Sequence, residues 1–258
     1  MENFETAYKR HLHDVTYHGE NITGRNGTTS QILGKQISAN LEEGFPIITS
    51  RRVFAKTMAI ETQWMLEGRT NVNWLNNKKV NIWNEWADEN GELGPVYGKQ
   101  LIDFHGKNQI KNLVLNIKKN LYSRRHVVTY WNPNEIKLMA LPPCHYSFQV
   151  LITNRVNIIV TMRSLDMFVG LPYDMGMYSI ICSSIAHELK MKAGKVIINA
   201  ASAHIYTEHK PLIKQYLNNN QFALPILHSV STFTNFNAAE FSLMNYCYSE
   251  HLKPEVVL

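Results

Sequence analysis

The chain has 258 residues, 45% of them apolar and 18% charged, which is the balance of a packed globular protein and excludes a disordered or fibrous one. No apolar run approaches the roughly 18 residues that span a bilayer, and the N-terminus lacks the apolar core of a signal peptide, so we expect a cytoplasmic protein. Lysine and arginine exceed the acids by 26 to 21, but they form no basic run of the kind that binds nucleic acid. The mild excess equally suits a small phosphate-bearing substrate, and we expect neither a membrane nor a nucleic-acid partner.

Helices and strands are expected to alternate irregularly in the first half of the chain. Apolar residues at helical spacing predict an amphipathic helix over 109–121. The glycine-rich segment GRNGTTS at 24–30 is typical of a loop. The further expected elements are helices over 2–17 and 56–66, the latter closed by Gly68, strands over 31–41 and 45–49, and a polar loop over 84–94.

The second half is richer in β-forming residues. Two expected strands, 146–153 and 155–162, are joined around Asn154, which suits a hairpin turn. The further expected elements are strands over 126–131 and 195–205 and helices over 175–189 and 211–217. Because strands and helices mix without a regular βαβ alternation, the pattern predicts an α+β fold. No repeat or linker divides the chain, so we expect one domain over 1–258.

Three cysteines, Cys144, Cys182 and Cys247, are an odd number without a Cys-x-x-Cys pair, which favours a reducing compartment over a disulfide framework. The segment LPPCH at 141–145 gives Cys144 a rigid, extended approach through two prolines. Taken alone, this pentapeptide fits a buried structural thiol better than a nucleophile.

Arginines elsewhere in the chain change that balance. A guanidinium group binds phosphate oxygens in a fork and can lower the pKa of a nearby thiol. Taken separately, each arginine fits an exposed surface residue. A thiolate beside several arginines, however, would act as a nucleophile on a phosphorylated substrate. The candidates are Arg25 in the glycine-rich loop, the adjacent Arg124 and Arg125, and Arg163 after a strand.

Longer motifs carry a resemblance to a known family. Between Ser123 and Tyr206 they are SRR (123–125), MALPPCH (139–145), MRSLDMFVGLPYDMGMYS (162–179) and HIY (204–206). Upstream motifs are EEGFPIIT (42–49), IETQWMLEGRTN (60–71) and IWNEWADENGELGPVYGKQ (82–100), and the C-terminal HLKPEVVL resembles a closing tail. Over nearly its whole length, the chain resembles the thymidylate synthases.

The resemblance implies an α+β fold with a mixed sheet flanked by helices, and a homodimer in which two such sheets pack back to back. It also implies transfer of one carbon from 5,10-methylenetetrahydrofolate to carbon 5 of a pyrimidine nucleotide monophosphate, without a metal. Cys144 matches the nucleophile that adds to carbon 6 of the ring, an addition that makes carbon 5 nucleophilic. Glu61 matches the carboxylate that organises water and proton transfers, and Tyr97 and His145 match its hydrogen-bond network.

Further matches concern binding rather than chemistry. The resemblance implies phosphate ligands within one subunit at Arg25, Arg163 and Ser164. It implies phosphate ligands donated by the partner subunit at Arg124 and Arg125. It implies contacts with the sugar hydroxyl at His204 and Tyr206. It implies folate contacts at Trp83, Asp166, Gly170 and the terminal Leu258.

One departure from the family pattern bears on the base that is read. The motif LPYDMGMYS carries Asp174 where thymidylate synthases have an asparagine that reads uracil. A carboxyl group can accept from the 4-amino group of cytosine and, when protonated, donate to N3, whereas a carboxylate would meet O4 of uracil acceptor to acceptor. Polar mismatches of this kind cost roughly 10⁴-fold in discrimination. Aspartate at this place is what the deoxycytidylate hydroxymethylases carry, and the alternative is a tolerated substitution in an ordinary thymidylate synthase.

The expected activity is therefore 5-hydroxymethylation of dCMP, in the host cytoplasm if a phage encodes the protein. No residue in the sequence indicates whether water or hydride completes the reaction, so a dCMP methylase is an alternative. Ala200, Ala201 and Ser202 replace the usual Gly-Gly-Asp on the sugar side, which leaves a CMP 5-hydroxymethylase open as well. Thymidylate synthesis from dUMP is a further alternative. A non-catalytic homologue that binds nucleotide or RNA is the remaining one, against which the intact Cys144 and Glu61 argue.

Overall fold

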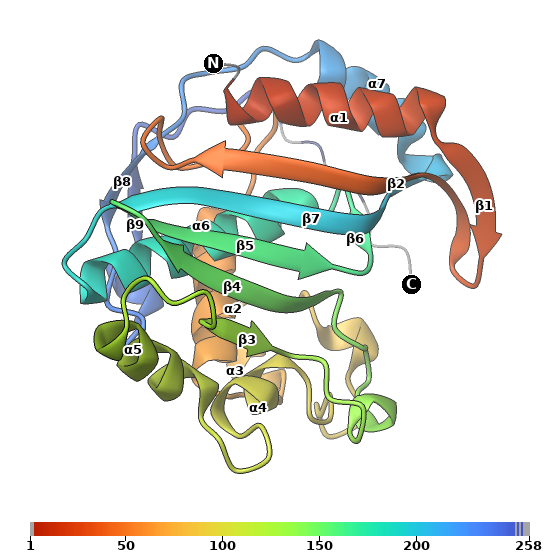
Figure 1. Ribbon diagram of the computed structural model, residues 1–258. Coiled ribbons are helices and arrows are strands. Elements are labelled where there is room, and N and C mark those ends of the chain that lie inside the picture. The colour runs from red at the N-terminus through yellow and green to blue at the C-terminus, as the bar shows by residue number, and fades with distance from the viewer. Residues whose placement is uncertain (1–2, 251, 253, 255–258) are drawn as a thin grey trace.

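A mixed sheet of seven strands forms the centre of the part of the chain that the structure, a computed structural model, describes: residues 3–250, 252 and 254 (Figure 1). The strand order is β1-β2-β7-β5-β4-β3, with β6 paired to β7 off this path. The strands are β1 Glu20–Gly24, β2 Gly27–Asn40, β3 Val127–Thr129, β4 His145–Ile152, β5 Val156–Met162, β6 Leu165–Asp166 and β7 Ala193–Tyr206, with β8 Ile226–Ser229 and β9 Ser242–Met244 in a separate pair. The helices are α1 Phe4–His18, α2 Ala55–Leu66, α3 Asn73–Asn76, α4 Tyr97–Ile102, α5 Gln109–Lys119, α6 Leu171–Glu188 and α7 Lys210–Asn218.

Strand direction brings several chain segments to one end of the sheet. β5 and β7 are parallel neighbours, so their carboxyl ends lie at the same end, and β6 continues beside β7 with Asp166 opposite His204. β4 is antiparallel to β5, and its first residue, His145, pairs with Met162 at the end of β5. β2 is antiparallel to β7 and also begins there. We call this end, where β4 begins and β5, β6 and β7 finish, the carboxyl end of the sheet.

The long helix α6 packs against β5, β7 and α2 and forms the core behind the sheet (Figure 1). Fourteen of its 18 residues are buried, as expected of a helix that is apolar on all sides. Close approach to α2 depends on Gly176, because a Cβ atom there would lie 2.2 Å from the Sδ atom of Met58. No helix in the described part of the chain is long and apolar enough to cross a membrane.

The opposite face of the sheet is only half-buried. Side chains along β4 and β5 alternate between buried and half-buried positions, and the half-buried set includes Ile159, which pairs in register with Ile197 of β7. On this face Gln36 donates from Nε2 to Oδ1 of Asn199 over 2.9 Å. In Figure 1 no helix of the described residues crosses the viewer's face of β2, β7 and β5.

The predicted α+β class, with a mixed sheet flanked by helices, is confirmed. The predicted helices over 56–66, 109–121 and 211–217 and the strands over 146–153, 155–162 and 195–205 correspond to observed elements within a few residues. The helix predicted over 2–17 corresponds to α1, apart from residue 2, which lies outside the described residues. α6 begins at Leu171, four residues before the predicted start, with Pro172 in its first turn, a position that proline favours.

Two predicted elements are wrong. Residues 24–30 are not a loop but most of a hairpin, in which β1 and β2 pair around a turn at Arg25 and Asn26. Gly27 supports this turn with a φ of +112°, a backbone conformation open to glycine. The apolar run over 45–49 is buried but is not a strand, because loops and side chains bind its backbone: the N–H of Phe45 donates to the carbonyl of Pro225.

The buried carboxylate of Glu5 ties helix α1 to the segment that leads into α2. It accepts from the backbone N–H groups of Thr49 and Ser50 over 2.8 and 2.7 Å, and from the hydroxyl of Tyr216 over 3.2 Å. Glu5 is 1% exposed, so these donors replace water as its partners. The α1 side chain Tyr8 extends the connection by donating to the carbonyl of Met167 over 2.8 Å.

We expect Glu5→Gln to destabilise the protein by about 2 to 4 kcal/mol, because the amide group puts a donor where the backbone also presents donors. Urea unfolding followed by circular dichroism measures the change. Glu20→Gln is the matched control, because Glu20 is exposed on β1, and its effect should be close to zero. Equal effects of the two substitutions would contradict the structural role of Glu5.

Candidate active site

Most of the candidate residues from distant parts of the chain meet at the carboxyl end of the sheet. Cys144 immediately precedes β4, Arg163 and Ser164 follow β5, and Asp166 lies in β6. Further candidates come from the end of β7, the first turn of α6, the middle of α2 and the start of α4, and they are His204, Tyr206, Asp174, Glu61 and Tyr97. The topology therefore assembles a site that sequence spacing alone does not reveal.

Cys144 is half-buried, and its neighbours fix the position of its sulfur. Its backbone N–H donates to the hydroxyl of Tyr97 over 2.8 Å, and its carbonyl accepts from the backbone N–H of Arg163 over 2.9 Å. The guanidinium of Arg163 donates to the carbonyls of Pro142 and Pro143 over 2.8 and 2.9 Å, which brings its Nη2 to 3.7 Å from Sγ of Cys144. The two prolines thus provide the acceptors that hold a cation beside the thiol.

Burial and this cation act on the thiol in opposite directions. Burial is the larger influence and raises the pKa of Cys144, while Arg163 lowers it and the carboxyl groups of Asp174 and Asp166 raise it further. The expected arginine neighbour is present, but its effect on the pKa does not prevail. In the free protein at neutral pH the thiol, rather than the thiolate, is the dominant form.

Two carboxyl groups near the thiol retain protons at unusually high pH. Burial raises the pKa of Glu61 to about 7, opposed by the indole of Trp83, which donates to its Oε1 over 2.9 Å. Burial also raises the pKa of Asp174 well above its ordinary value, and repulsion from Glu61 and Asp166 adds to the effect. Glu61 therefore titrates near neutrality, where proton transfer in both directions is easiest, and Asp174 keeps its proton to higher pH than an ordinary aspartic acid does.

Asp166 shapes the tight connection between β6 and α6. Its Oδ1 accepts from the backbone N–H groups of Phe168 and Val169 over 2.8 and 2.9 Å. Gly170 follows, and a Cβ atom there would approach the carbonyl of Asp166 to 3.1 Å and Oδ2 of Asp174 to 3.4 Å. The absence of a side chain at Gly170 thus keeps both carboxyl groups accessible to one ligand.

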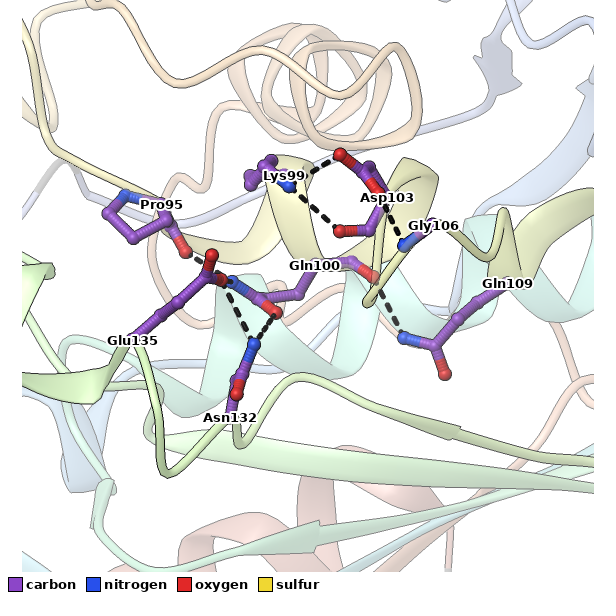
Figure 2. Close-up of polar contacts among 8 residues, drawn as sticks. All are labelled: Pro95, Lys99, Gln100, Asp103, Gly106, Gln109, Asn132 and Glu135. Atoms are coloured by element: carbon purple, nitrogen blue, oxygen red, sulfur yellow. Dashed lines mark hydrogen bonds and ion pairs between the residues drawn. The ribbon is translucent and has the colours of Figure 1, made fainter.

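Tyr97 and His145 form one stack next to Cys144. Their rings lie 4.3 Å apart with an angle of 22° between the planes. Tyr97 is the first residue of α4. The buried Gln100 holds this short helix in place, because its Nε2 donates to the carbonyl of Pro95 over 2.8 Å and to the carboxylate of Glu135 over 2.7 Å (Figure 2). This network fixes the tyrosine that holds the backbone of Cys144.

A cavity of about 220 Å³ opens at the start of β2 and the end of β7. Arg25, Ser164, His204 and Tyr206 all line it, so four of the expected nucleotide ligands share one space. Burial lowers the pKa of His204, against the attraction of Asp166, so its imidazole is neutral at pH 7. A hydroxyl-rich, singly charged cavity of this kind can accept a sugar and a phosphate.

Two expected ligands lie elsewhere. Arg124 and Arg125 are exposed just before β3, at the edge of the sheet opposite to β1 and Arg25. Among the described residues, neither lines the cavity with Arg25. Leu258 lies outside the described residues, whereas Trp83 is placed beside Glu61 by its indole hydrogen bond.

A second cavity, of about 390 Å³, was not anticipated from the sequence. Its walls include Ile60, the neighbour of Glu61 on α2, and the aromatic rings of Phe54, Tyr246 and Tyr248. Four cationic side chains also line this cavity: Arg52, Lys56, Lys78 and Lys79. The adjacent basic residues at 51–52 and 78–79 resemble the pair Arg124 and Arg125. They are a sequence signal from which this cavity could have been predicted.

The fold and this geometry define a cysteine-centred site with a basic and a polar cavity beside it. No group of three or more histidine, cysteine, aspartate or glutamate side chains within the described part of the chain could hold a metal ion. A family model described as thymidylate synthase matches residues 6–258. Thymidylate synthases of the Coxiella burnetii strains Dugway 5J108-111, RSA 331 / Henzerling II and RSA 493 / Nine Mile phase I are each 38% identical to this chain over 249 residues, covering 93% of this chain and 94% of the relative. The chain belongs to the thymidylate synthase family.

We expect alkylation of Cys144 by iodoacetamide to keep accelerating above pH 9, where an ordinary exposed thiol has levelled off, because burial raises its pKa. The experiment uses a Cys247→Ser background, since Cys247 is exposed and Cys182 is buried. Arg163→Gln removes the opposing charge and should slow the reaction at pH 8 by about threefold or more.

Arg155→Gln is the matched control, because Arg155 precedes β5 at the other end of that strand and contacts Glu42. The pH profile of Cys144 alkylation in the Arg155→Gln protein should match that of the parent protein. A profile that levels off at or below pH 8 in the parent protein would contradict the assigned balance of burial and charge at Cys144.

Proposed function

We propose that this protein is a methylenetetrahydrofolate-dependent 5-hydroxymethyltransferase that acts on dCMP, with residues 1–258 working as one catalytic domain. The thymidylate synthase family uses methylenetetrahydrofolate as its co-substrate, and its members act by one-carbon transfer to carbon 5 of a pyrimidine nucleotide. The choice of cytosine rests on the half-buried carboxyl group of Asp174, whose pKa burial raises well above its ordinary value.

A neutral carboxyl group has the hydrogen-bonding pattern that cytosine requires. Its O–H donates to N3 of the ring, and its carbonyl oxygen accepts from the 4-amino group. Uracil presents the reverse pattern, an N3–H donor and an O4 acceptor, which this acid matches only with its proton on the other oxygen, and the carboxylate would face O4 acceptor to acceptor. The raised pKa keeps Asp174 in the form that suits cytosine.

Cys144 performs the covalent step. Its sulfur bonds to carbon 6 of the ring while the electron pair of the C5–C6 double bond moves to carbon 5. Glu61, with a pKa of about 7, accepts and returns the protons of these steps near neutral pH. The co-substrate supplies a one-carbon unit at the oxidation level of formaldehyde. Carbon 5 would bond to this one-carbon unit and lose its proton, and tetrahydrofolate would leave as the amine. Addition of water to the one-carbon group, with departure of the Cys144 sulfur from carbon 6, would then give the hydroxymethyl product without any external oxidant or reductant.

The residues present fit the co-substrate. The cavity of about 390 Å³ has aromatic walls for flat rings and four cationic side chains for the carboxylates of a glutamyl tail. Its wall includes Ile60, which precedes Glu61 in α2. On the other side, Asp166 and Gly170 present a carboxylate and an open backbone to a polar heterocycle.

The phosphate is bound in this proposal by Arg25, Arg163 and Ser164 of one subunit and by Arg124 and Arg125 of the partner. The position of the last two supports a dimer, because they lie at the far edge of the sheet from Arg25 within one chain. The half-buried sheet face with Ile159 and Ile197 is the surface that a second copy would cover.

Thymidylate synthesis from dUMP is the second candidate, because the Coxiella relatives at 38% identity are named thymidylate synthases. The two functions differ at Asp174 and in the last step, in which hydride rather than water would complete the product. The carboxyl group at position 174, with its raised pKa, favours the cytosine reaction.

We expect Asp174→Asn to lower kcat/KM for dCMP by about a hundredfold or more and to raise it for dUMP, because it places here the residue with which thymidylate synthases read uracil. Rates with both nucleotides are measured side by side. Asp103→Asn is the control, since Asp103 is exposed after α4. An unchanged preference in Asp174→Asn would refute base reading by this residue.

We expect activity to return when an inactive Cys144→Ser protein is mixed with an inactive Arg124→Gln/Arg125→Gln protein and the subunits exchange. Half of the dimers would be hybrids with one complete site each, which restores about a quarter of the sites. Light scattering establishes the oligomeric state in parallel. A fully active monomer, or no recovery in exchanged dimers, would contradict the sharing of arginines.

A further inference from the structure

Gln31 of β2 lies directly opposite His204 of β7, and both residues line the cavity of about 220 Å³. Directly opposed residues of antiparallel strands have their side chains on one face of the sheet, so the amide of Gln31 lies beside the imidazole of His204. Gln31 was not singled out from the sequence, because a glutamine in a strand is typical of an exposed polar position. Its place in the cavity makes it a candidate ligand.

Ser202 determines which end of the Gln31 amide faces the cavity. Its hydroxyl donates to Oε1 of Gln31 over 2.9 Å, so the oxygen of the amide is turned toward a group of the protein. Both residues are half-buried and both line the cavity. With the oxygen engaged, the amide has its two N–H groups left for a ligand. Gln31 therefore presents a donor whose orientation is fixed by the neighbouring strand.

A further hydroxyl group lies on the other side of Ser202. Leu165 pairs with Ala203 where β6 runs beside β7, so Ser164, one residue earlier, lies beside Ser202. Ser164, Ser202 and Gln31 thus form a row across three neighbouring segments of the sheet, and all three line the cavity. One ligand in the cavity can contact both ends of this row.

The groups around the cavity fall into two chemical kinds. Arg25 and the N–H end of Gln31 can only donate, which suits a phosphate group, whose terminal oxygens are acceptors. His204 and Tyr206 are different, because the neutral imidazole and the phenol can each donate and accept, as a sugar hydroxyl requires. The donor pattern therefore places Gln31 with the phosphate ligands rather than with the sugar ligands.

We propose that Gln31 is a further ligand of the nucleotide phosphate and donates an N–H of its amide to a phosphate oxygen, with Ser202 as the positioning residue that holds the amide in this orientation. The inference rests on the proposed function in one respect, that the substrate is a pyrimidine nucleotide monophosphate, and it deepens that function by adding a neutral ligand to the expected arginines. The base takes no part in it.

Equilibrium binding of dCMP, measured by calorimetry, tests the contact. Gln31→Met keeps the length of the side chain and removes the donor, so we expect the dissociation constant to rise about tenfold, the effect of one hydrogen bond to a charged group. kcat at saturating dCMP should stay within about twofold, because a phosphate contact is the same in the ground state and the transition state. Gln215→Met is the matched control, since Gln215 is exposed on α7 and its amide donates to Glu250. A dissociation constant that does not change in Gln31→Met would overturn the proposal.

Separate ligands distinguish the phosphate from the sugar. Inorganic phosphate should bind about tenfold more weakly to Gln31→Met than to the parent protein, whereas deoxycytidine should bind equally to both. CMP and dCMP should be weakened by the same factor, because they differ only in the 2′-hydroxyl. Weaker binding of deoxycytidine, or a changed ratio between CMP and dCMP, would place the amide on the sugar and refute the phosphate assignment.

The role of Ser202 is tested by a double-mutant cycle. Ser202→Ala alone should raise the dissociation constant of dCMP about threefold, because the amide of Gln31 is then free to rotate. In the Gln31→Met background the same substitution should have no further effect, since it acts through the amide. Equal factors in both backgrounds would contradict the positioning role.

A second variant and a second nucleotide keep the outcome decisive. If Gln31→Met does not fold, Gln31→Asn replaces it, because the amide is then one methylene shorter and out of reach, and the same loss of affinity is expected. The binding comparison is repeated with dUMP, whose sugar and phosphate are those of dCMP. If the protein binds and converts only dUMP, the proposed function fails. A tenfold loss of dUMP affinity in Gln31→Met would still support the phosphate contact, and no loss would overturn it.

Discussion

Burial of acidic groups at the carboxyl end of the sheet is the constraint on which the chemistry of this protein depends. Desolvation is the largest influence on Cys144, Glu61, Asp174 and His145 alike. It disfavours every charged form, so the free site has a thiol, carboxyl groups with raised pKa values, one of which titrates near neutrality, and a neutral imidazole. Such groups offer donors and acceptors in fixed places, which is what reading the edge of a pyrimidine requires.

The few charges that remain are held by the backbone. Arg163 stays beside the thiol because the two carbonyls of the diproline accept from it, and Asp166 is fixed by the N–H groups that follow it. α6 supplies the acid in its first turn and the histidine partner one turn later. The topology adds the sugar and phosphate side, because parallel β5 and β7 end together and bring Ser164 next to His204 and Tyr206.

The sequence predicted the local structure where periodicity is strong and failed where tertiary contacts decide. The amphipathic pattern of α5 and the β-rich hairpin of β4 and β5 were recognisable because the side chains that face the core recur at a fixed spacing. The run over 45–49 is equally apolar, yet its backbone binds Pro225 and Glu5 instead of a strand. No local sequence pattern predicts contacts with residues so far away in the chain. The short α4 was missed because a network around Gln100, not propensity, holds it.

For the site, the type of residue was predictable and its state was not. Motifs pointed to Cys144 and its arginines, but the sequence favoured a lowered thiol pKa, and burial reverses that direction. Asp174 was visible as a departure from the family pattern, although its raised pKa follows from burial, with added repulsion from Glu61 and Asp166, which lie far apart in the chain.

The central claim is that a buried acid makes this member of the family act on cytosine. Tritium release from carbon 5 tests it most directly, with the purified protein, methylenetetrahydrofolate and, in turn, 5-tritiated dCMP, CMP and dUMP, and with the products identified by mass. The account predicts release from dCMP and a product heavier by a hydroxymethyl group. Release from dUMP alone, with a methylated product, would contradict it.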